Sequence, residues 1–236
     1  MQVEFVRTYI EGYDKELGGG IPKGHIVLVA GAPGTMKSSV TFSIIYNNMK
    51  KRGSKGLYIT IEESKESLLT GMERLGMGDF DEKSLAIVDI GKLRLEYRVV
   101  EETRNWLKIL MEHLQTKVAS EGYEFVVLDS LTALSSIMEF ENPRQELYHF
   151  FGFLKGLKVT ALLLMEVMKE DEMFGAFHEA YLADGLIYLK FHDVGETESQ
   201  LRIKCAKMRY TKHNHGYMAL LFKEGTGFMV TPVISE

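Results

Sequence analysis

The 236-residue chain has a single cysteine, Cys205, and only four prolines. One cysteine excludes an intramolecular disulfide, which fits a reducing compartment. No apolar run approaches the roughly 18 residues that a membrane-spanning helix needs, and the start of the chain lacks a signal-peptide pattern. We therefore expect a cytoplasmic protein with no membrane insertion, in which Cys205 is a small buried core residue.

The chain also lacks an excess of positive charge. Its formal net charge is -5 and its pI is about 5.9, which argues against a protein that mainly binds nucleic-acid phosphates. No Pro/Ser-rich linker, low-complexity segment or internal repeat divides it. Because 45% of its residues are hydrophobic, the chain can form a sizeable core, and we predict one domain over residues 1–236.

The chain contains a phosphate-binding loop that is complete except at one position. In the usual pattern, Gly, four residues, then Gly-Lys-Ser/Thr, backbone N–H groups surround phosphate, the lysine reaches the β/γ-phosphates and the hydroxyl ligates Mg²⁺. Met36 stands where that pattern has glycine, and its Cβ restricts the backbone. The predicted nucleotide-binding residues of this loop are Gly31, Ala32, Pro33, Gly34, Thr35, Met36, Lys37, Ser38 and Ser39.

The flanking residues have the order that such a loop requires. Residues 25–30 form a nearly continuous apolar run, typical of a buried parallel strand. Apolar residues then recur at helical spacing from Val40 to Met49, and Gly53 supplies a stop. The pattern predicts a strand, a turn and a helix N-terminus whose amides point at phosphate.

Further apolar runs predict an α/β fold. Strands are expected at 57–61, 125–129 and 159–165, and a helix at about 103–114. Alternating strands and helices of this kind favour a mainly parallel sheet covered on both faces. Residues 201–206 alternate like a half-exposed strand, and residues 216–222 and 227–233 predict a C-terminal β-hairpin.

Acidic residues follow several of these strands, where ligands bind in parallel sheets. Asp129 has the form of a Walker B carboxylate that holds Mg²⁺. Glu62 and Glu63 would follow a strand beside the loop strand and face opposite ways, one of them orienting the attacking water. Spacing alone equally allows an acidic start to the next helix. Glu166, after a third strand, stays open between sensing the nucleotide and a salt bridge.

Five blocks together resemble the RecA-superfamily ATPases of the KaiC type, over about residues 6–230. They are residues 10–24, the phosphate loop, Glu62-Glu63-Ser64, Leu128-Asp129-Ser130 and residues 207–213. The resemblance implies a RecA-like P-loop NTPase core that commonly forms a hexameric ring, with ATP at the subunit interface. It also implies that Lys37 contacts phosphate, that Ser38 and Asp129 hold Mg²⁺, and that Glu62 and Glu63 are the catalytic pair.

The resemblance further implies that Lys207, Arg209 and His213 reach the nucleotide of the neighbouring subunit. From spacing alone a solvated basic turn is favoured for Lys207 and Arg209; with the resemblance, two cations at a strand end suit a γ-phosphate in the manner of an arginine finger. His213 and His215 lack the partners of a metal site.

The predicted function is a Mg²⁺-dependent ATPase that works as a homo-oligomer with ATP or ADP bound, together with a protein partner that the sequence does not identify. The alternative is a nucleotide-binding regulatory or scaffolding module with little hydrolysis, because of Met36. Recombinase-like DNA binding follows from fold kinship alone and is disfavoured by the acidic balance.

Overall fold

The computed structural model describes residues 3–92, 106–137 and 142–233 of the chain. Its centre is a nine-stranded sheet with the order β11-β10-β9-β8-β3-β7-β6-β4-β5. The six strands from β8 to β5 in this order run parallel to one another. They are β3 (Ile26–Gly31), β4 (Gly56–Thr60), β5 (Leu85–Asp89), β6 (Phe125–Asp129), β7 (Thr160–Glu166) and β8 (Gly185–Val194).

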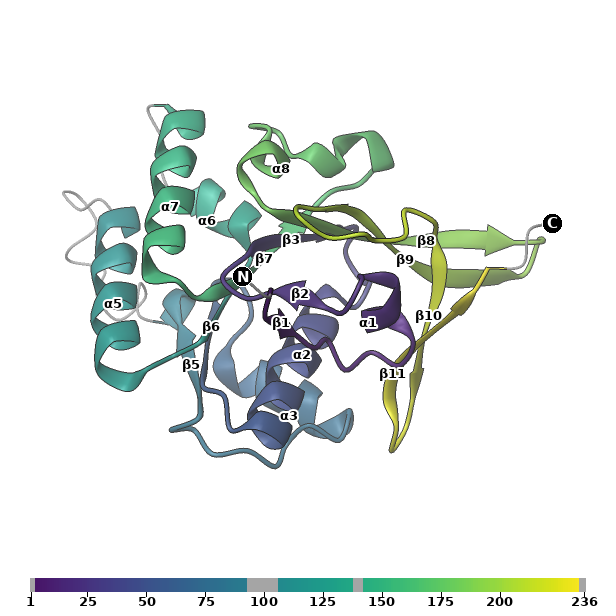
Figure 1. Ribbon diagram of the computed structural model, residues 1–236, viewed down its shortest axis with the longest axis horizontal. Helices are drawn as coiled ribbons and strands as arrows, with labels where there is room; N and C mark the ends of the chain where they lie inside the picture. The colour runs from purple at the N-terminus through teal and green to yellow at the C-terminus, as the bar shows by residue number, and fades with distance from the viewer. Residues whose placement is uncertain (1–2, 93–105, 138–141, 234–236) are drawn as a thin grey trace.

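Three antiparallel strands extend the sheet beyond β8. They are β9 (Glu198–Met208), β10 (Met218–Lys223) and β11 (Gly227–Pro232). The C-terminal hairpin and the mainly parallel α/β sheet are both confirmed. In Figure 1, β8 and β9 form a long ribbon that projects away from the helices of the parallel part.

Helices cover both faces of the parallel strands (Figure 1). One face carries α2 (Lys37–Arg52) and α3 (Lys65–Arg74), and the other carries α5 (Trp106–Glu121), α6 (Leu131–Ile137) and α7 (Pro143–Leu157). Strand β3 shows why both faces are buried, since Val27 and Val29 pack into the α2 cluster while Ile26 and Leu28 pack into the α7 cluster. Successive side chains of a strand point to opposite faces, so a strand covered on both sides must be apolar throughout.

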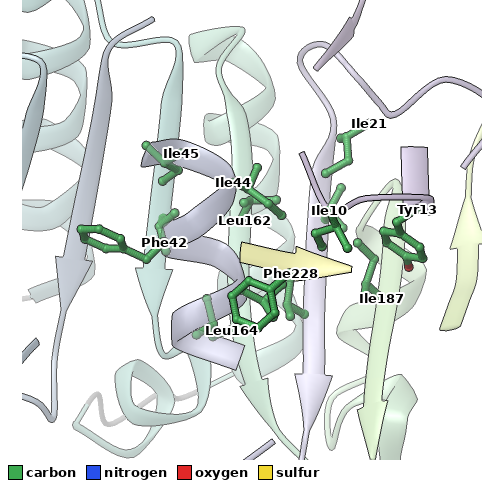
Figure 2. Close-up of a cluster of buried hydrophobic side chains, with 14 of the residues drawn as sticks. Ile10, Tyr13, Ile21, Phe42, Ile44, Ile45, Leu162, Leu164, Ile187 and Phe228 are labelled. Atoms are coloured by element: carbon green, nitrogen blue, oxygen red, sulfur yellow. The ribbon is translucent and has the colours of Figure 1, made fainter. Parts of the chain in front are cut away.

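The two ends of the described chain meet over the α2 face. Figure 2 shows Ile44 of α2, Leu164 of β7 and Phe228 of β11 in one cluster of buried side chains. The N-terminal part contributes α1 (Tyr13–Glu16) and a small sheet of β1 (Phe5–Val6) and β2 (Ile21–Pro22). The N–H of Glu11 donates to the carbonyl of Phe228 at 2.9 Å, so the first and last segments are joined directly.

The connection from β7 to β8 contains a short 3₁₀ helix, η2 (Glu170–Phe174), and α8 (Glu179–Leu182). It leaves the sheet beside the phosphate loop, at the carboxyl edge of the parallel strands, and returns to the amino edge before β8. None of the described helices is long and apolar enough to cross a membrane.

The strands predicted at 25–30, 57–61 and 159–165 are each displaced by one residue, and that at 125–129 is unchanged. Helix α2 ends as predicted at Gly53, whose φ of 68° is left-handed. Thr103, at the start of the predicted helix, lies outside the described residues. Cys205 is a buried core residue as predicted, and burial raises the pKa of its thiol to about 12.

One expectation about the sheet is wrong. The strand that precedes Glu62 and Glu63 is β4, and β7 and β6 lie between it and the loop strand β3. The sequence order of strands does not fix their order in a sheet, because each helical crossover allows the next strand to be placed beyond a neighbour. The two glutamates also follow the strand rather than belonging to it, so the strict alternation of strand side chains does not apply to them.

Candidate nucleotide site

The phosphate loop begins at a glycine that no other residue can replace without displacing its neighbours. A Cβ on Gly31 would lie 2.5 Å from the carbonyl oxygen of Leu189 and 2.7 Å from Oγ1 of Thr35. Thr35 Oγ1 donates to the carbonyl of Ala32 at 2.7 Å and closes the turn, while Gly34 takes a φ of 82°. The sequence therefore forms a tight turn directly after β3, as the motif predicts.

Met36 occupies its position in the conformation that favours glycine. Its φ of 59° and ψ of 25° are left-handed, which costs a residue with a Cβ about 1–2 kcal/mol. The half-buried side chain packs against the hydrophobic core on the α2 face. The backbone thus follows a left-handed turn despite the Cβ, and the extra side chain is accommodated by the core.

Helix α2 starts immediately after Met36 without a side-chain cap. The first backbone N–H groups of a helix have no partner within the helix, so those of Lys37, Ser38 and Ser39 are available to an anion. Lys37 is nearly buried, and its Nζ donates to the Ala32 carbonyl at 3.0 Å. Burial lowers the pKa of Lys37, and the carboxylates of Glu166 and Asp129 act against that shift.

Ser38 and Asp129, the predicted Mg²⁺ ligands, both interact with one buried hydroxyl. Tyr58 of β4 donates to Oδ2 of Asp129 at 2.6 Å, and the same hydroxyl lies within interaction range of Ser38 and Thr41. Burial, followed by the charge of Asp129, raises the pKa of Tyr58 well above its usual value, so this hydroxyl stays a donor.

Oxygen ligands at this place suit Mg²⁺, which is usually held by one or two carboxylates together with substrate phosphates. Among the described residues, no group of three His, Cys, Asp or Glu side chains is arranged to hold a metal ion. The Ser38 hydroxyl and the Asp129 carboxylate are the two protein ligands that the sequence predicts for such a site.

Glu62 and Glu63 follow β4 at the same edge of the sheet. The N–H of Ile61, the residue before them, donates to the carbonyl of Asp129 at 2.9 Å, which places both glutamates near the end of β6. Glu63 Oε1 accepts from the Ser67 hydroxyl of α3 at 2.7 Å. Glu62 is exposed and makes no hydrogen bond or ion pair with the described part of the chain. Among the described residues, the pair is therefore divided between Glu63, which contacts helix α3, and Glu62, whose side chain has no partner.

Glu166, at the end of β7, lies opposite Gly31 in the register of β3 and β7. Its backbone N–H donates to Thr132 Oγ1 at 2.9 Å, and its side chain makes no salt bridge within the described ranges. A pocket of about 380 Å³ opens beside it, lined also by Thr132 and by Glu179 of α8. The sequence left two roles open for Glu166, sensing the nucleotide or forming a salt bridge. The described residues give its side chain no salt bridge.

Lys207 and Arg209 lie at the opposite edge of the sheet from the phosphate loop. Strand β9 runs antiparallel, so its end at Met208 pairs with Gly185, which in turn pairs with Val27 near the start of β3. The length of β3 separates that edge from the loop by about 16 Å, at roughly 3.3 Å per residue. Within one chain, the structure does not bring these cations to the loop.

Both cations are held by the β7–β8 connection. Lys207 Nζ donates to the carbonyls of Ala180 and Ala183, each at 2.7 Å. Arg209 donates through Nη1 to Oδ1 of Asp184 at 3.0 Å and through Nη2 to the Tyr181 carbonyl at 3.1 Å. These contacts differ from those of a freely solvated basic turn, because each cation has two fixed acceptors.

His213 lies beyond the same edge, with its ring centroid 4.4 Å from that of His215. Its Nδ1 is 3.3 Å from the Thr211 hydroxyl, and its buried Nε2 has no hydrogen-bond partner in the described structure. Burial, followed by His215, lowers the pKa of His213, so the ring is neutral near pH 7. We find no metal-binding group around the two histidines among the described residues.

Two site residues were missed from the sequence. Tyr58 lies in a predicted strand, where an aromatic residue is ordinary, and only the tertiary structure brings its hydroxyl to Ser38 and Asp129. Asp184 interrupts an apolar stretch just before β8, a strand that we did not predict. The sequence did contain a signal for Asp184, because it is an acidic residue in an apolar stretch. Buried carboxylates are rare unless they are paired, so such a residue indicates a nearby cation.

The fold and this loop define an α/β P-loop protein with a RecA-like sheet. A family model described as "ATPase: KaiC" matches residues 6–233, so the chain belongs to the KaiC ATPase family, a nucleotide-binding branch of the RecA superfamily.

Relatives of this chain include proteins described by two different names. A protein of Aeropyrum pernix named UPF0273 protein is 30% identical over 221 residues, covering 90% of this chain and 88% of the relative. The circadian clock oscillator protein KaiC of Picosynechococcus is 30% identical over 223 residues, covering 91% of this chain but 42% of that protein. A crystal structure of a KaiC-like protein from Pyrococcus horikoshii shares the fold, with a TM-score of 0.83, 24% identity and coverage of 98% and 100%.

Proposed function

We propose that this chain is a Mg²⁺-dependent ATPase, one domain over residues 1–236, that works in the cytoplasm as a ring-shaped homo-oligomer. The observation that carries the proposal is that Lys37, Ser38 and Asp129 lie together at the carboxyl edge of the sheet, where the Tyr58 hydroxyl interacts with Ser38 and Asp129 and the charge of Asp129 acts on Lys37. These groups come from two elements, α2 and β6, and supply a cation, a hydroxyl and a carboxylate. A cation for the phosphates, together with a hydroxyl and a carboxylate for Mg²⁺, is the set of groups that binding of a nucleoside triphosphate with Mg²⁺ requires.

In the proposed site, the loop amides and Lys37 bind the phosphates, and Ser38 and Asp129 hold Mg²⁺, which neutralises charge on the phosphates. Glu62 orients the attacking water and accepts its proton, because it is the glutamate of the pair whose side chain has no partner among the described residues. Glu63, bound to Ser67, fixes the backbone that carries Glu62.

The proposed oligomer follows from the two edges of the sheet. Lys207, Arg209 and His213 lie at or beyond the amino edge of the parallel strands, and the length of β3, about 16 Å, separates that edge from the chain's own phosphate loop. A second copy would have to present its own amino edge to this loop to complete the site. Such a head-to-tail contact closes into a ring when its rotation allows.

Phosphate release from purified protein tests the catalytic part of this proposal. Lys37→Ala and the double change Glu62→Gln with Glu63→Gln should each reduce the rate by about a hundredfold or more. Glu73→Gln is a matched control, since Glu73 is an exposed glutamate on the nearby helix α3 whose side chain makes no hydrogen bond or ion pair with the described residues. Unchanged release in both site variants would refute the ATPase assignment.

Co-expression of two inactive variants tests the shared site. Lys37→Ala removes the lysine of the chain's own loop, and Arg209→Ala removes the arginine that the chain would present to a neighbouring loop. In a mixed ring, some interfaces pair an intact Lys37 of one copy with an intact Arg209 of the next. For random mixing, about a quarter of the interfaces should be complete, and that fraction of wild-type activity should return. No recovery in mixed particles of native mass would show that each chain forms its own site.

A nucleotide-dependent regulatory module with little hydrolysis is the second candidate, and the left-handed Met36 favours it. A strained loop residue beside the phosphates can slow turnover without abolishing binding. The test compares turnover of the wild type with that of Met36→Gly at saturating ATP. Much faster turnover in the glycine variant would support the regulatory module, whereas similar rates would support the ATPase.

A further inference from the structure

Asp184 joins the phosphate-loop strand to the cations at the amino edge of the sheet. It lies between α8 and β8, and its side chain is 9% exposed. Its Oδ2 accepts from the backbone N–H of Ile26, the first residue of β3, at 3.1 Å. Its own N–H donates to the Ile26 carbonyl at 2.8 Å, so main chain and side chain are both fixed to the strand that leads to the phosphate loop.

The other carboxylate oxygen of Asp184 is shared by two cations. Oδ1 accepts from Lys155 Nζ of α7 at 3.1 Å and from Arg209 Nη1 at 3.0 Å. The Asp184 carbonyl also accepts from the Arg209 N–H at 2.9 Å, so Arg209 is held through its backbone and its side chain. Asp184 carries one negative charge, which Lys155 alone would balance. The charge of Arg209 is therefore in excess of what Asp184 neutralises.

The guanidinium of Arg209 is held in one orientation, and some of its N–H donors remain available. Its two described side-chain bonds go to Asp184 and to the Tyr181 carbonyl, and the side chain is 37% exposed. A guanidinium has five N–H donors in a rigid fork, so donors remain for a further acceptor. Lys207 lies beside it on the carbonyls of Ala180 and Ala183. With Lys155, the three cations outnumber the single carboxylate, and this edge favours an anion.

We propose that Asp184 is a positioning residue, which holds the Arg209 guanidinium in the orientation that meets the γ-phosphate bound by a neighbouring copy. The proposal rests on the proposed function of a nucleotide shared between copies. A mobile arginine side chain loses rotamer freedom when it binds a phosphate, whereas one that two acceptors already hold in the binding orientation does not. A displacement of about 1 Å in such a group is enough to reduce a rate by about a hundredfold.

The experiment measures kcat and KM for ATP in Asp184→Asn, which keeps the shape of the side chain and removes its charge. We expect kcat to fall about tenfold or more while KM changes less than about twofold, because the chain's own loop still binds the nucleotide. Asp193→Asn is the matched control, since Asp193 is an exposed aspartate of β8 whose side chain has no hydrogen-bond or ion-pair partner in the described part of the chain. Unchanged kcat in Asp184→Asn would overturn the proposal.

A double-mutant cycle separates positioning from a general structural role. In the Arg209→Ala background, Asp184→Asn should cause no further loss of kcat, because the group it positions is gone. A full additional loss would show that Asp184 acts through something else and would also overturn the proposal. If Asp184→Asn does not keep the wild-type native mass and thermal midpoint, Asp184→Glu is used in the same cycle, with the same expected and contradicting results.

A binding measurement distinguishes failure of this proposal from failure of the proposed function. The function fails if the hydrolysis rate does not depend on Lys37. In that case, affinities for ADP and for a non-hydrolysable ATP analogue still report on the γ-phosphate. Asp184→Asn and Arg209→Ala should lower the preference for the analogue by the same factor, about fivefold or more. An unchanged preference in Asp184→Asn would overturn the positioning role whatever the hydrolysis rate.

Discussion

Replacing Met36 by glycine tests whether the phosphate loop carries backbone strain. Met36 has φ 59° and ψ 25°, where a residue with a Cβ costs about 1–2 kcal/mol more than glycine. Glycine would relieve this cost, but it would lose the packing of a half-buried methionine, about 1 kcal/mol, which is roughly half the value for full burial. Glycine also adds about 0.5–1 kcal/mol of freedom to the unfolded chain. The contributions nearly cancel, and we expect Met36→Gly to change the free energy of unfolding by less than about 1 kcal/mol.

Met36→Ala provides the matched comparison. Alanine loses the same side-chain packing but keeps the Cβ, so it retains the strain that glycine relieves. We therefore expect Met36→Ala to be less stable than Met36→Gly by about 1 kcal/mol. For a chain of this length, about 1 kcal/mol corresponds to a shift of about 2–4 °C in the thermal midpoint, and urea titration gives the free energy directly.

The difference between the two variants is the informative quantity, because the lost packing cancels between them. On ordinary helical or extended backbone, alanine is more stable than glycine. A Met36→Ala variant as stable as Met36→Gly, or more stable, would therefore refute the left-handed conformation at Met36. It would also remove the structural reason for expecting slow turnover.

The remaining predictions concern three residues: Leu164 in the core, the buried Tyr58, and Glu170, which is half-buried. Leu164→Ala should lower the free energy of unfolding by about 3 kcal/mol in urea titration, because the side chain is fully buried in β7. Tyr58→Phe should raise the Mg²⁺ concentration needed for half-maximal activity, because Asp129 loses a hydrogen bond of 2.6 Å. Burial raises the pKa of Tyr58, so the wild type should lose stability above about pH 10, where the unfolded tyrosine ionises, and Tyr58→Phe should lose less of it. The pKa of Glu170 is shifted in the opposite direction from that of Tyr58. Burial raises the pKa of Glu170, but hydrogen bonds from Lys190 and Lys204 outweigh burial and lower it to about 2. The stability that wild type has over Glu170→Gln should thus be present above about pH 4.5 and disappear as the pH falls toward 2.

Each of these has a distinct contradicting outcome. A loss under about 1 kcal/mol for Leu164→Ala would mean that the α2 face is loosely packed. Equal Mg²⁺ dependence in Tyr58→Phe would separate the hydroxyl from the metal site, and identical alkaline unfolding of that variant and wild type would place the tyrosine in solvent. A stability difference for Glu170→Gln that stayed constant between pH 5 and pH 2 would contradict the lowered pKa.

Much of the fold was predictable from local sequence alone. Strand β3 and helix α2 carry apolar residues at periods that belong to buried strands and amphipathic helices, and Gly53 fixes where α2 ends. The C-terminal hairpin was predicted in the same way, from two β-rich segments around a turn. These signals are local, because they depend on which residues follow one another within a single element.

Other parts of the fold depended on contacts distant in sequence. Strand β5 was not predicted, and neither was β8, which pairs directly with the loop strand. The place of β4, three strands from β3, was predicted wrongly, because crossover helices leave the strand order open.

For the candidate site, the sequence by itself determined the chemistry, and the tertiary structure decided the arrangement. Lys37, Ser38 and Asp129 were found from motifs whose spacing is set by a tight turn and a strand end. The role of the Tyr58 hydroxyl, the division between Glu62 and Glu63, and the hold of Asp184 on Arg209 depend on which strands lie side by side. Only the antiparallel course of β9 places the cations at the far edge from the loop, because a strand's direction reverses which edge its end reaches.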